Sequence, residues 1–180
     1  QAFVLQWLVD EVQENFFNMP VDNVVNSFVK SINKYLGEGA VDEEAIRSLH
    51  ALGYLPLIIK SIPEGSLVQM KVPTLTIRNT NERFAWLVGY LETLTSSELW
   101  PAATAATIAF NYKCIGKFWS ELTCDNDEHL QWQFHDFSAR GDMGMWASTL
   151  VGMGHMTSFT GTDGVFARER IIHQYNSGDD

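Results

Sequence analysis

Residues 130–141, with the sequence LQWQFHDFSARG, decide the fold that we expect for the C-terminal part of this chain. Apolar and polar residues alternate from Leu130 to His135, which is the period of a half-buried β-strand. A short loop ends at Gly141, and the pattern then predicts a helix over about residues 142–151. The segment therefore predicts one strand, one loop and one helix.

A second segment of the same kind follows. Residues 155–160 predict another strand, Gly161-Thr162-Asp163 a turn, and the residues after it a last helix. Strands that alternate with helices of about ten residues indicate parallel βαβ units. Because the loops that follow parallel strands lie at one edge of the sheet, we expect residues 136–141 and 161–163 to lie side by side.

The sequence before the polar loop at residues 124–128 has a different organisation. Three helices are expected there, followed by three short strands and two further helices on either side of Trp100-Pro101. The expected helices cover residues 3–17, 20–36, 42–52, about 81–99 and about 102–122, and the expected strands cover residues 57–62, 67–72 and 74–78. Pro20 and Asp42 are typical helix starts, and Gly37 and Gly53 are typical helix ends.

The fold class that we expect is α/β, with an α+β N-terminal part. Residues 1–125 would form a domain of helices and short strands, and residues 126–180 the first two βα units of an incomplete α/β barrel. Two units are too few to close a barrel. The chain also lacks an initiator methionine, so we expect it to be an internal piece of a longer protein.

The composition excludes several classes of protein. Of 180 residues, 46% are hydrophobic and 19% charged, which is typical of a globular chain. The formal net charge of −10 argues against binding to nucleic acid or to an anionic membrane, although a single arginine can still hold a phosphate. The sequence has neither the roughly 20-residue apolar run of a membrane span nor a basic signal-peptide start. We expect a cytoplasmic protein in which Cys114 and Cys124 are free thiols.

Three side chains in the two predicted loops have the chemistry to bind an aromatic base and a phosphate. Phe137 can present its ring to a planar ligand. Arg140 carries a planar fork of donors that suits phosphate, and Gly141 lets the backbone come close to a ligand. Asp163 can accept hydrogen bonds from an amide. We therefore expect a small-ligand site at this edge.

Each of these residues also has a purely structural interpretation. Phe137 fits a core position, Arg140 fits a solvated surface or an ion pair with Asp136, and Asp163 fits a helix N-cap. His135 fits a hydrogen-bonded structural role better than an acid–base role. The remaining histidines and acidic residues do not have metal-ligand spacing. Residue spacing alone thus leaves the reaction open.

Longer motifs resemble the nicotinamide phosphoribosyltransferase family, one of the type II phosphoribosyltransferases. The similar segments are residues 55–65 (LPLIIKSIPEG), 77–80 (IRNT), 135–141 (HDFSARG) and 159–163 (FTGTD). Their order and spacing agree along nearly the whole chain. The resemblance implies an α/β barrel beside a separate domain of helices and β-structure, with an active site across a homodimer interface.

The resemblance also implies a role for each of the three loop residues. Phe137 matches the aromatic residue that stacks on the pyridine ring, and Arg140 matches the arginine that binds the mononucleotide phosphate. Asp163 matches the carboxylate that accepts hydrogen bonds from the carboxamide. Ala139 departs from the bulky aromatic common at its position, which removes no binding group.

By this resemblance the full-length parent would be a pentosyltransferase of NAD salvage, which transfers phosphoribosyl from PRPP to nicotinamide and gives nicotinamide mononucleotide. ATP and Mg²⁺ are expected for the parent, with binding groups outside this chain. The family's catalytic histidine would lie beyond Asp180, so we expect no catalytic residue and no metal ligand here, and an inactive isolated chain.

Two alternatives stay open at this point. The first is a nicotinate phosphoribosyltransferase, against which Asp163 argues, because two carboxylates in one pocket repel each other. The second is a non-catalytic binding or assembly module that has kept the fold. Unpaired strand edges and exposed apolar faces in an incomplete barrel would also favour self-association.

Overall fold

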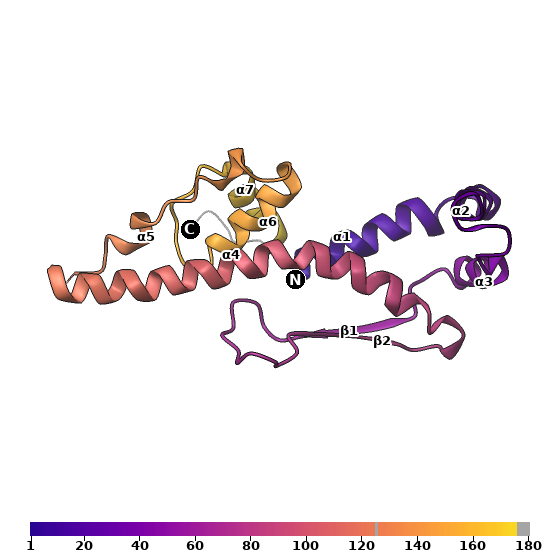
Figure 1. Ribbon diagram of the computed structural model, residues 1–180, viewed down its shortest axis with the longest axis horizontal. Helices are drawn as coiled ribbons and strands as arrows, with labels where there is room; N and C mark the ends of the chain where they lie inside the picture. Colours follow the sequence, from indigo (N-terminus) through magenta and orange to yellow (C-terminus); the bar gives the residue numbers. More distant parts are fainter. Residues whose placement is uncertain (125, 176–180) are drawn as a thin grey trace. The chain divides into compact units, whose positions relative to one another are not determined.

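The computed structural model of the chain describes residues 1–124 and 126–175. The described part is mostly helical and contains one two-stranded sheet (Figure 1). The chain divides into two compact units, Gln1–Thr93 and Leu94–Asp180. The chain is therefore mixed α/β, as expected at the level of fold class, while its assignment to a partial barrel stays a prediction.

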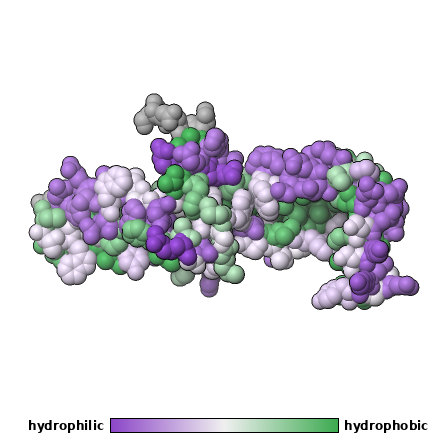
Figure 2. Space-filling view, turned by 90° about the horizontal axis from the view of Figure 1, so that it is seen from above, coloured by the Kyte–Doolittle hydropathy of each residue, from purple (hydrophilic) through white to green (hydrophobic). Residues whose placement is uncertain are grey.

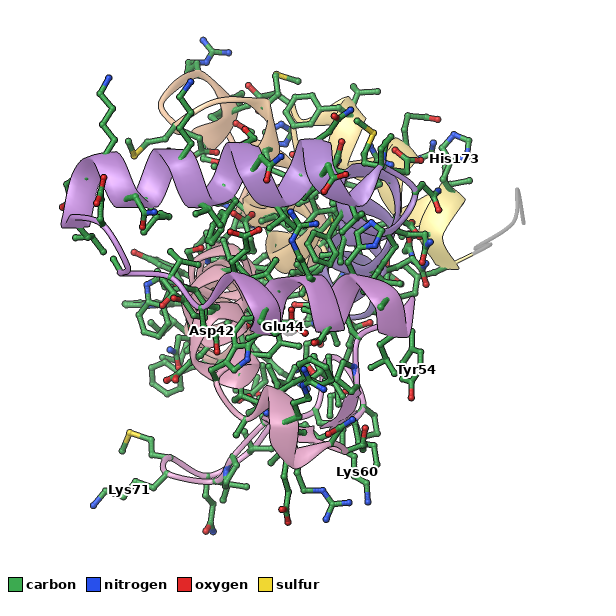
Figure 3. All side chains as sticks on the ribbon, turned by 90° about the vertical axis from the view of Figure 1, so that its right-hand side faces the viewer. Asp42, Glu44, Tyr54, Lys60, Lys71 and His173 are labelled. Atoms are coloured by element: carbon green, nitrogen blue, oxygen red, sulfur yellow. The ribbon has the colours of Figure 1, made fainter. Side chains whose placement is uncertain are left out.

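Unit 1 begins with three helices that follow the sequence prediction closely. They are α1 (Ala2–Val12), which continues into a π-helical turn at Gln13–Phe17, α2 (Val21–Leu36) and α3 (Glu43–Leu52). Asp42 caps α3, because its Oδ1 accepts a hydrogen bond from the backbone N–H of Ala45 at 3.1 Å. Asp42 and Glu44 lie at the start of this helix in Figure 3. Gly53 ends it with a positive φ of 78°.

The sheet of unit 1 pairs β1 (Leu57–Ser61) with β2 (Leu75–Asn79) in antiparallel register, with Ile59 opposite Ile77. Both strands were predicted. The strand predicted at residues 67–72 is wrong: these residues, all described, form no strand in the loop between β1 and β2. Side chains of this loop, including Lys71, are exposed (Figure 3), so an apolar strand here would bury nothing.

The core of unit 1 forms where α1, α3 and the beginning of α4 (Leu87–Thr123) meet. Five buried side chains make up this cluster: Leu8, Leu49, Phe84, Leu87 and Leu91. Each fully buried side chain of this size contributes roughly 1.5–3 kcal/mol through removal of apolar surface from water. The cluster therefore holds the N-terminal helices and the start of α4 together as one unit.

Helix α4 runs without a break through Pro101 (Figure 1). The predicted interruption at Trp100-Pro101 is therefore wrong. A proline inside a helix costs about 3 kcal/mol because it removes one hydrogen bond and crowds the preceding turn. The alanine-rich sequence that follows has high helix propensity, and this offsets the loss.

Unit 2 packs short helices against the later part of α4. These elements are α5 (Leu130–Gln133), a 3₁₀ turn at Ser138–Arg140, α6 (Met145–His155) and α7 (Val165–Tyr175). Helices α6 and α7 lie side by side (Figure 1). A Cβ on Gly116 of α4 would come within 2.7 Å of the Phe134 ring. The compact units divide at residues 93/94, and the predicted domain boundary at residues 125/126 stays a prediction.

Both strands predicted in unit 2 are wrong. Residues 130–133 are helical, and α6 continues to His155 before a turn at residues 156–158. In the part of unit 2 that the structure describes, the parallel pairing is reduced to one bridge between Asp136 and Thr162. Backbone N–H and C=O groups that lack a strand partner must find other hydrogen bonds. Around this bridge, residues 130–133 and 145–158 make them in helices and turns.

The surface of α4 in unit 2 carries large apolar side chains. Ile108, Tyr112, Ile115, Trp119 and Leu122 are each at least 50% exposed and follow one another at intervals of four and three residues. Figure 2 shows hydrophobic residues among hydrophilic ones on one face of the molecule. Self-association through such surfaces stays a prediction. None of the described helices has the length and apolar character needed to cross a membrane.

Candidate functional site

The two loops that the sequence singled out lie side by side. The backbone N–H of Asp136 donates to the carbonyl oxygen of Gly161 at 3.0 Å, and the N–H of Asp163 donates to the carbonyl oxygen of Asp136 at 3.0 Å. These two bonds form the parallel bridge between Asp136 and Thr162. The expected adjacency is therefore present, although a single bridge replaces the two long strands.

This adjacency brings Phe137, Arg140 and Asp163 together. Arg140 Nη2 lies 3.2 Å from Asp163 Oδ2, and Arg140 Cζ lies 6.0 Å from the centroid of the Phe137 ring. Phe137 is 60% exposed, so it is not a core residue. The Arg140 side chain is 78% exposed and pairs with Asp163, not with Asp136. A ring, a guanidinium and a carboxylate thus occupy one small patch of surface.

One carboxylate oxygen of Asp163 has no hydrogen-bond partner among the described residues. Its Oδ2 is paired with Arg140, whereas its Oδ1 is buried and has no hydrogen-bond partner among the described residues. The capping interpretation therefore does not account for Oδ1. A buried acceptor without a donor costs free energy, roughly 1–3 kcal/mol, so an amide N–H that reached this atom would gain a favourable bond.

His135 supports the ring of Phe137. The two ring centroids are 4.4 Å apart with an interplanar angle of 42°. A Cβ on Gly161 would come within 2.7 Å of His135 Nδ1, so glycine at this position leaves the imidazole its place. His135 was expected to be structural, but sequence reasoning missed its contact with Phe137, which forms without the strand that was predicted there.

Asp136 is the residue that links the two loops most extensively. Its Oδ1 accepts from the backbone N–H of Ser138 at 2.9 Å, and its Oδ2 accepts from the Thr162 hydroxyl at 3.1 Å. Partial burial, the largest single influence, raises the pKa of Asp136. The hydrogen bonds from Ser138 and Thr162 and the nearby His155 act in the opposite direction and together hold this pKa below its ordinary value. The carboxylate is therefore ionised at neutral pH.

The described residues, 1–124 and 126–175, contain no cluster of three or more His, Cys, Asp or Glu side chains that could hold a metal ion. The patch at Phe137, Arg140 and Asp163 offers an exposed ring, a cation and a hydrogen-bond acceptor. Such a set fits a flat polar ring joined to an anionic group.

No protein-family model matches the chain. Nearly all of the chain is nevertheless similar to curated proteins of the phosphoribosyltransferase class. A protein from Acinetobacter baylyi is 47% identical over 97% of the chain. One from Xanthomonas campestris pv. campestris is 36% identical over 62% of it, and one from Mycoplasma genitalium is 29% identical over 78%.

All three relatives are named nicotinamide phosphoribosyltransferase. The chain covers 35%, 24% and 37% of their respective lengths, so it spans about a third of the curated relatives that it matches. The chain is therefore homologous to a section of nicotinamide phosphoribosyltransferases. The resemblance that its motifs predicted is confirmed.

Proposed function

We propose that this chain is the part of a nicotinamide phosphoribosyltransferase that holds the pyridine base and the nucleotide phosphate. The whole protein would transfer phosphoribosyl from PRPP to nicotinamide, giving nicotinamide mononucleotide and pyrophosphate for NAD salvage. The observation that carries this proposal is the meeting of Phe137, Arg140 and Asp163 at one bridge between two loops. The names of the relatives support the same conclusion.

In this proposal each side chain binds a different part of the ligand. The nicotinamide ring stacks on the exposed face of Phe137, a contact worth about 1 kcal/mol beyond simple burial. The carboxamide N–H donates to the carboxylate of Asp163, whose Oδ1 has no partner among the described residues. The exposed guanidinium of Arg140 binds the phosphate through paired N–H donors.

The reaction forms a bond between the pyridine nitrogen and C1 of the ribose and breaks the bond from C1 to the pyrophosphate oxygen. The electron pair of the broken bond leaves with pyrophosphate, and the sugar passes through a positively charged, oxocarbenium-like state. Holding the base in line with the leaving group lowers the entropic part of the barrier. The residues of this chain would contribute that alignment and would not donate or accept a proton in the transfer.

The carboxylate of Asp163 favours the amide over the acid as substrate. Nicotinate would place a second carboxylate beside Asp163, and two such groups repel unless one is protonated. An amide instead donates to the carboxylate. Nicotinate phosphoribosyl transfer is therefore the second candidate, and a comparison of the two bases decides between them.

The barrel, the dimer interface and the cofactors of the parent enzyme are part of the same proposal. Residues 126–180 would belong to the α/β barrel of the parent, and the active site would be completed across a homodimer interface. ATP and Mg²⁺ would be bound by groups outside this chain. No step assigned to Phe137, Arg140 or Asp163 depends on either of them.

The test is to express the complete open reading frame that carries this segment and to incubate the protein with PRPP and either nicotinamide or nicotinate. We expect mass spectrometry to detect nicotinamide mononucleotide, and we expect Asp163→Ala to raise the KM for nicotinamide at least tenfold. Asp10→Ala, at an exposed position on α1, is the matched control and should behave like the wild type. Product from nicotinate alone would favour the acid enzyme, and no product from either base would favour a non-catalytic module.

A further inference from the structure

We infer that Asp136 and Thr162 form a positioning pair that sets the distance between the stacking ring and the amide-binding carboxylate, and so governs the affinity for the base. This inference rests on the proposed function. It concerns two residues that are not assigned any contact with the ligand. Their side chains join the two loops directly, because the Thr162 hydroxyl donates to Asp136 Oδ2 at 3.1 Å.

The positions of Asp136 and Thr162 in the sequence explain how this pair can affect binding of the base. Phe137 directly follows Asp136, and Asp163 directly follows Thr162. Any change in the separation of Asp136 and Thr162 therefore moves the ring and the carboxylate relative to each other. A misplacement of about 1 Å in a binding group is enough to lower a reaction rate by roughly a hundredfold.

Both members of the pair are held by further hydrogen bonds. Asp136 Oδ1 accepts from the N–H of Ser138, which fixes the first loop, at 2.9 Å. The Thr162 hydroxyl oxygen also accepts from the N–H of Gly164, which fixes the second loop, at 2.9 Å. The Thr162 hydroxyl thus acts as donor and acceptor at once, and a side chain without a hydroxyl leaves both Asp136 Oδ2 and the N–H of Gly164 without this partner.

The surroundings of the pair leave little room for rearrangement. A Cβ on Gly152 of α6 would lie 3.8 Å from Asp136 Oδ2 and only 2.7 Å from the Cβ of Ala167 on α7. His155 of α6 bonds through Nε2 to the carbonyl oxygen of Gly161 at 3.0 Å. The carboxylate of Asp136 therefore lies close to the α6–α7 contact, and the bond between His155 and Gly161 ties the second loop to α6.

The experiment compares Thr162→Val with Thr162→Ser in the protein from the complete open reading frame. Valine keeps the shape of threonine and removes the hydroxyl, whereas serine keeps the hydroxyl. We expect Thr162→Val to raise the KM for nicotinamide about tenfold, because loss of a bond to a charged, partly buried acceptor is costly. The KM for PRPP should rise less than the KM for nicotinamide, because its phosphate is assigned to Arg140 in one loop, whereas the base is held by groups in both loops. Thr162→Ser should stay within about threefold of the wild type for both substrates.

An equal rise in the KM for nicotinamide and the KM for PRPP would overturn the inference. If Thr162→Val raises both KM values equally, or if valine and serine variants are indistinguishable, the pair has only a general structural role. If Thr162→Val does not fold, Asp136→Asn takes its place, since its amide oxygen can still accept from Ser138 while its charge is lost. This variant must show the same selective rise in the KM for nicotinamide, and an unchanged KM overturns the inference.

Different results would contradict the proposed function and the positioning role of Asp136 and Thr162. A wild-type protein that forms no nicotinamide mononucleotide removes the proposed function, and the positioning role falls with it. A wild-type protein that forms the product, with variants that keep a normal KM for nicotinamide, removes only the positioning role. The comparison with PRPP separates a local displacement of the base from a general loss of structure.

Discussion

Arg140 and Asp163 are bonded to each other, with 3.2 Å between Nη2 and Oδ2, although we assign them to opposite ends of one ligand. An exposed ion pair of this kind contributes only about 0–1 kcal/mol. The pair therefore keeps both groups at the site and is easily exchanged for ligand contacts. A phosphate can bind the Arg140 guanidinium and a carboxamide can bind the Asp163 carboxylate, and the ion pair that they replace costs little free energy to break.

The first prediction concerns the charge of Arg140. Arg140→Gln removes the cation, so we expect the affinity for nicotinamide mononucleotide to fall at least tenfold while the affinity for nicotinamide changes less than about threefold. Titration calorimetry of the complete protein measures both. Arg168→Gln, an exposed arginine paired with Glu169 on α7, is the control and should leave both affinities unchanged. Equal losses for base and nucleotide would contradict the assignment of Arg140 to the phosphate.

The second prediction concerns the ring of Phe137. Phe137→Leu keeps an apolar side chain and loses the aromatic face, so we expect the KM for nicotinamide to rise about fivefold, which corresponds to roughly 1 kcal/mol. Phe137→Tyr should retain nearly full affinity. Trp132→Leu, which also removes an exposed aromatic ring from unit 2, should have no effect on the KM. A leucine variant with normal affinity would show that the base does not stack on this ring.

The third prediction concerns the close approach of Gly161 to His135. A methyl group at Gly161 would come within 2.7 Å of His135 Nδ1, so the imidazole must move and loses its contact with Phe137. We expect Gly161→Ala to lower the stability by about 1–3 kcal/mol. Gly89→Ala is the control, because a Cβ at that position in α4 meets no atom within 4 Å. Thermal unfolding followed by circular dichroism should separate the two, and equal melting temperatures would refute the predicted crowding.

Local signals predicted the N-terminal helices well because each is decided within a few residues. Asp42 and Gly53, for example, give α3 its start and its end, and both act through the backbone next to them. The alternation at residues 130–134 misled us, because so short a run fits a strand or a helical turn equally well. Its outcome depends on tertiary contacts, including that of Gly116 with Leu130 and Phe134.

That Phe137, Arg140 and Asp163 lie close together was predictable from their place in two adjacent loops, while their role in ligand binding stays a prediction. Their mutual contacts were not predictable. Arg140 pairs with Asp163 because the two loops are aligned side by side, and the bridge between Asp136 and Thr162 sets that alignment. The sequence placed these two residues in the loops without indicating that their side chains bond each other.

The last prediction follows from the lowered pKa of Asp136. The pKa of this carboxyl lies below its ordinary value of 3.8 in the folded chain, so the folded state binds fewer protons there than the unfolded state. The stabilisation from the ionised carboxylate is therefore complete above about pH 4–5 and is lost as the pH falls through the folded pKa. Three groups favour the charged form of Asp136, namely Ser138, Thr162 and His155.

We expect Asp136→Asn to melt several degrees below the wild type at pH 7, and we expect this difference in melting temperature to shrink steadily below pH 4. Because both proteins carry the same other carboxylates, only the difference between their melting curves reports on Asp136, and a difference that stays constant down to pH 2 would show that its charge does not stabilise the bridge.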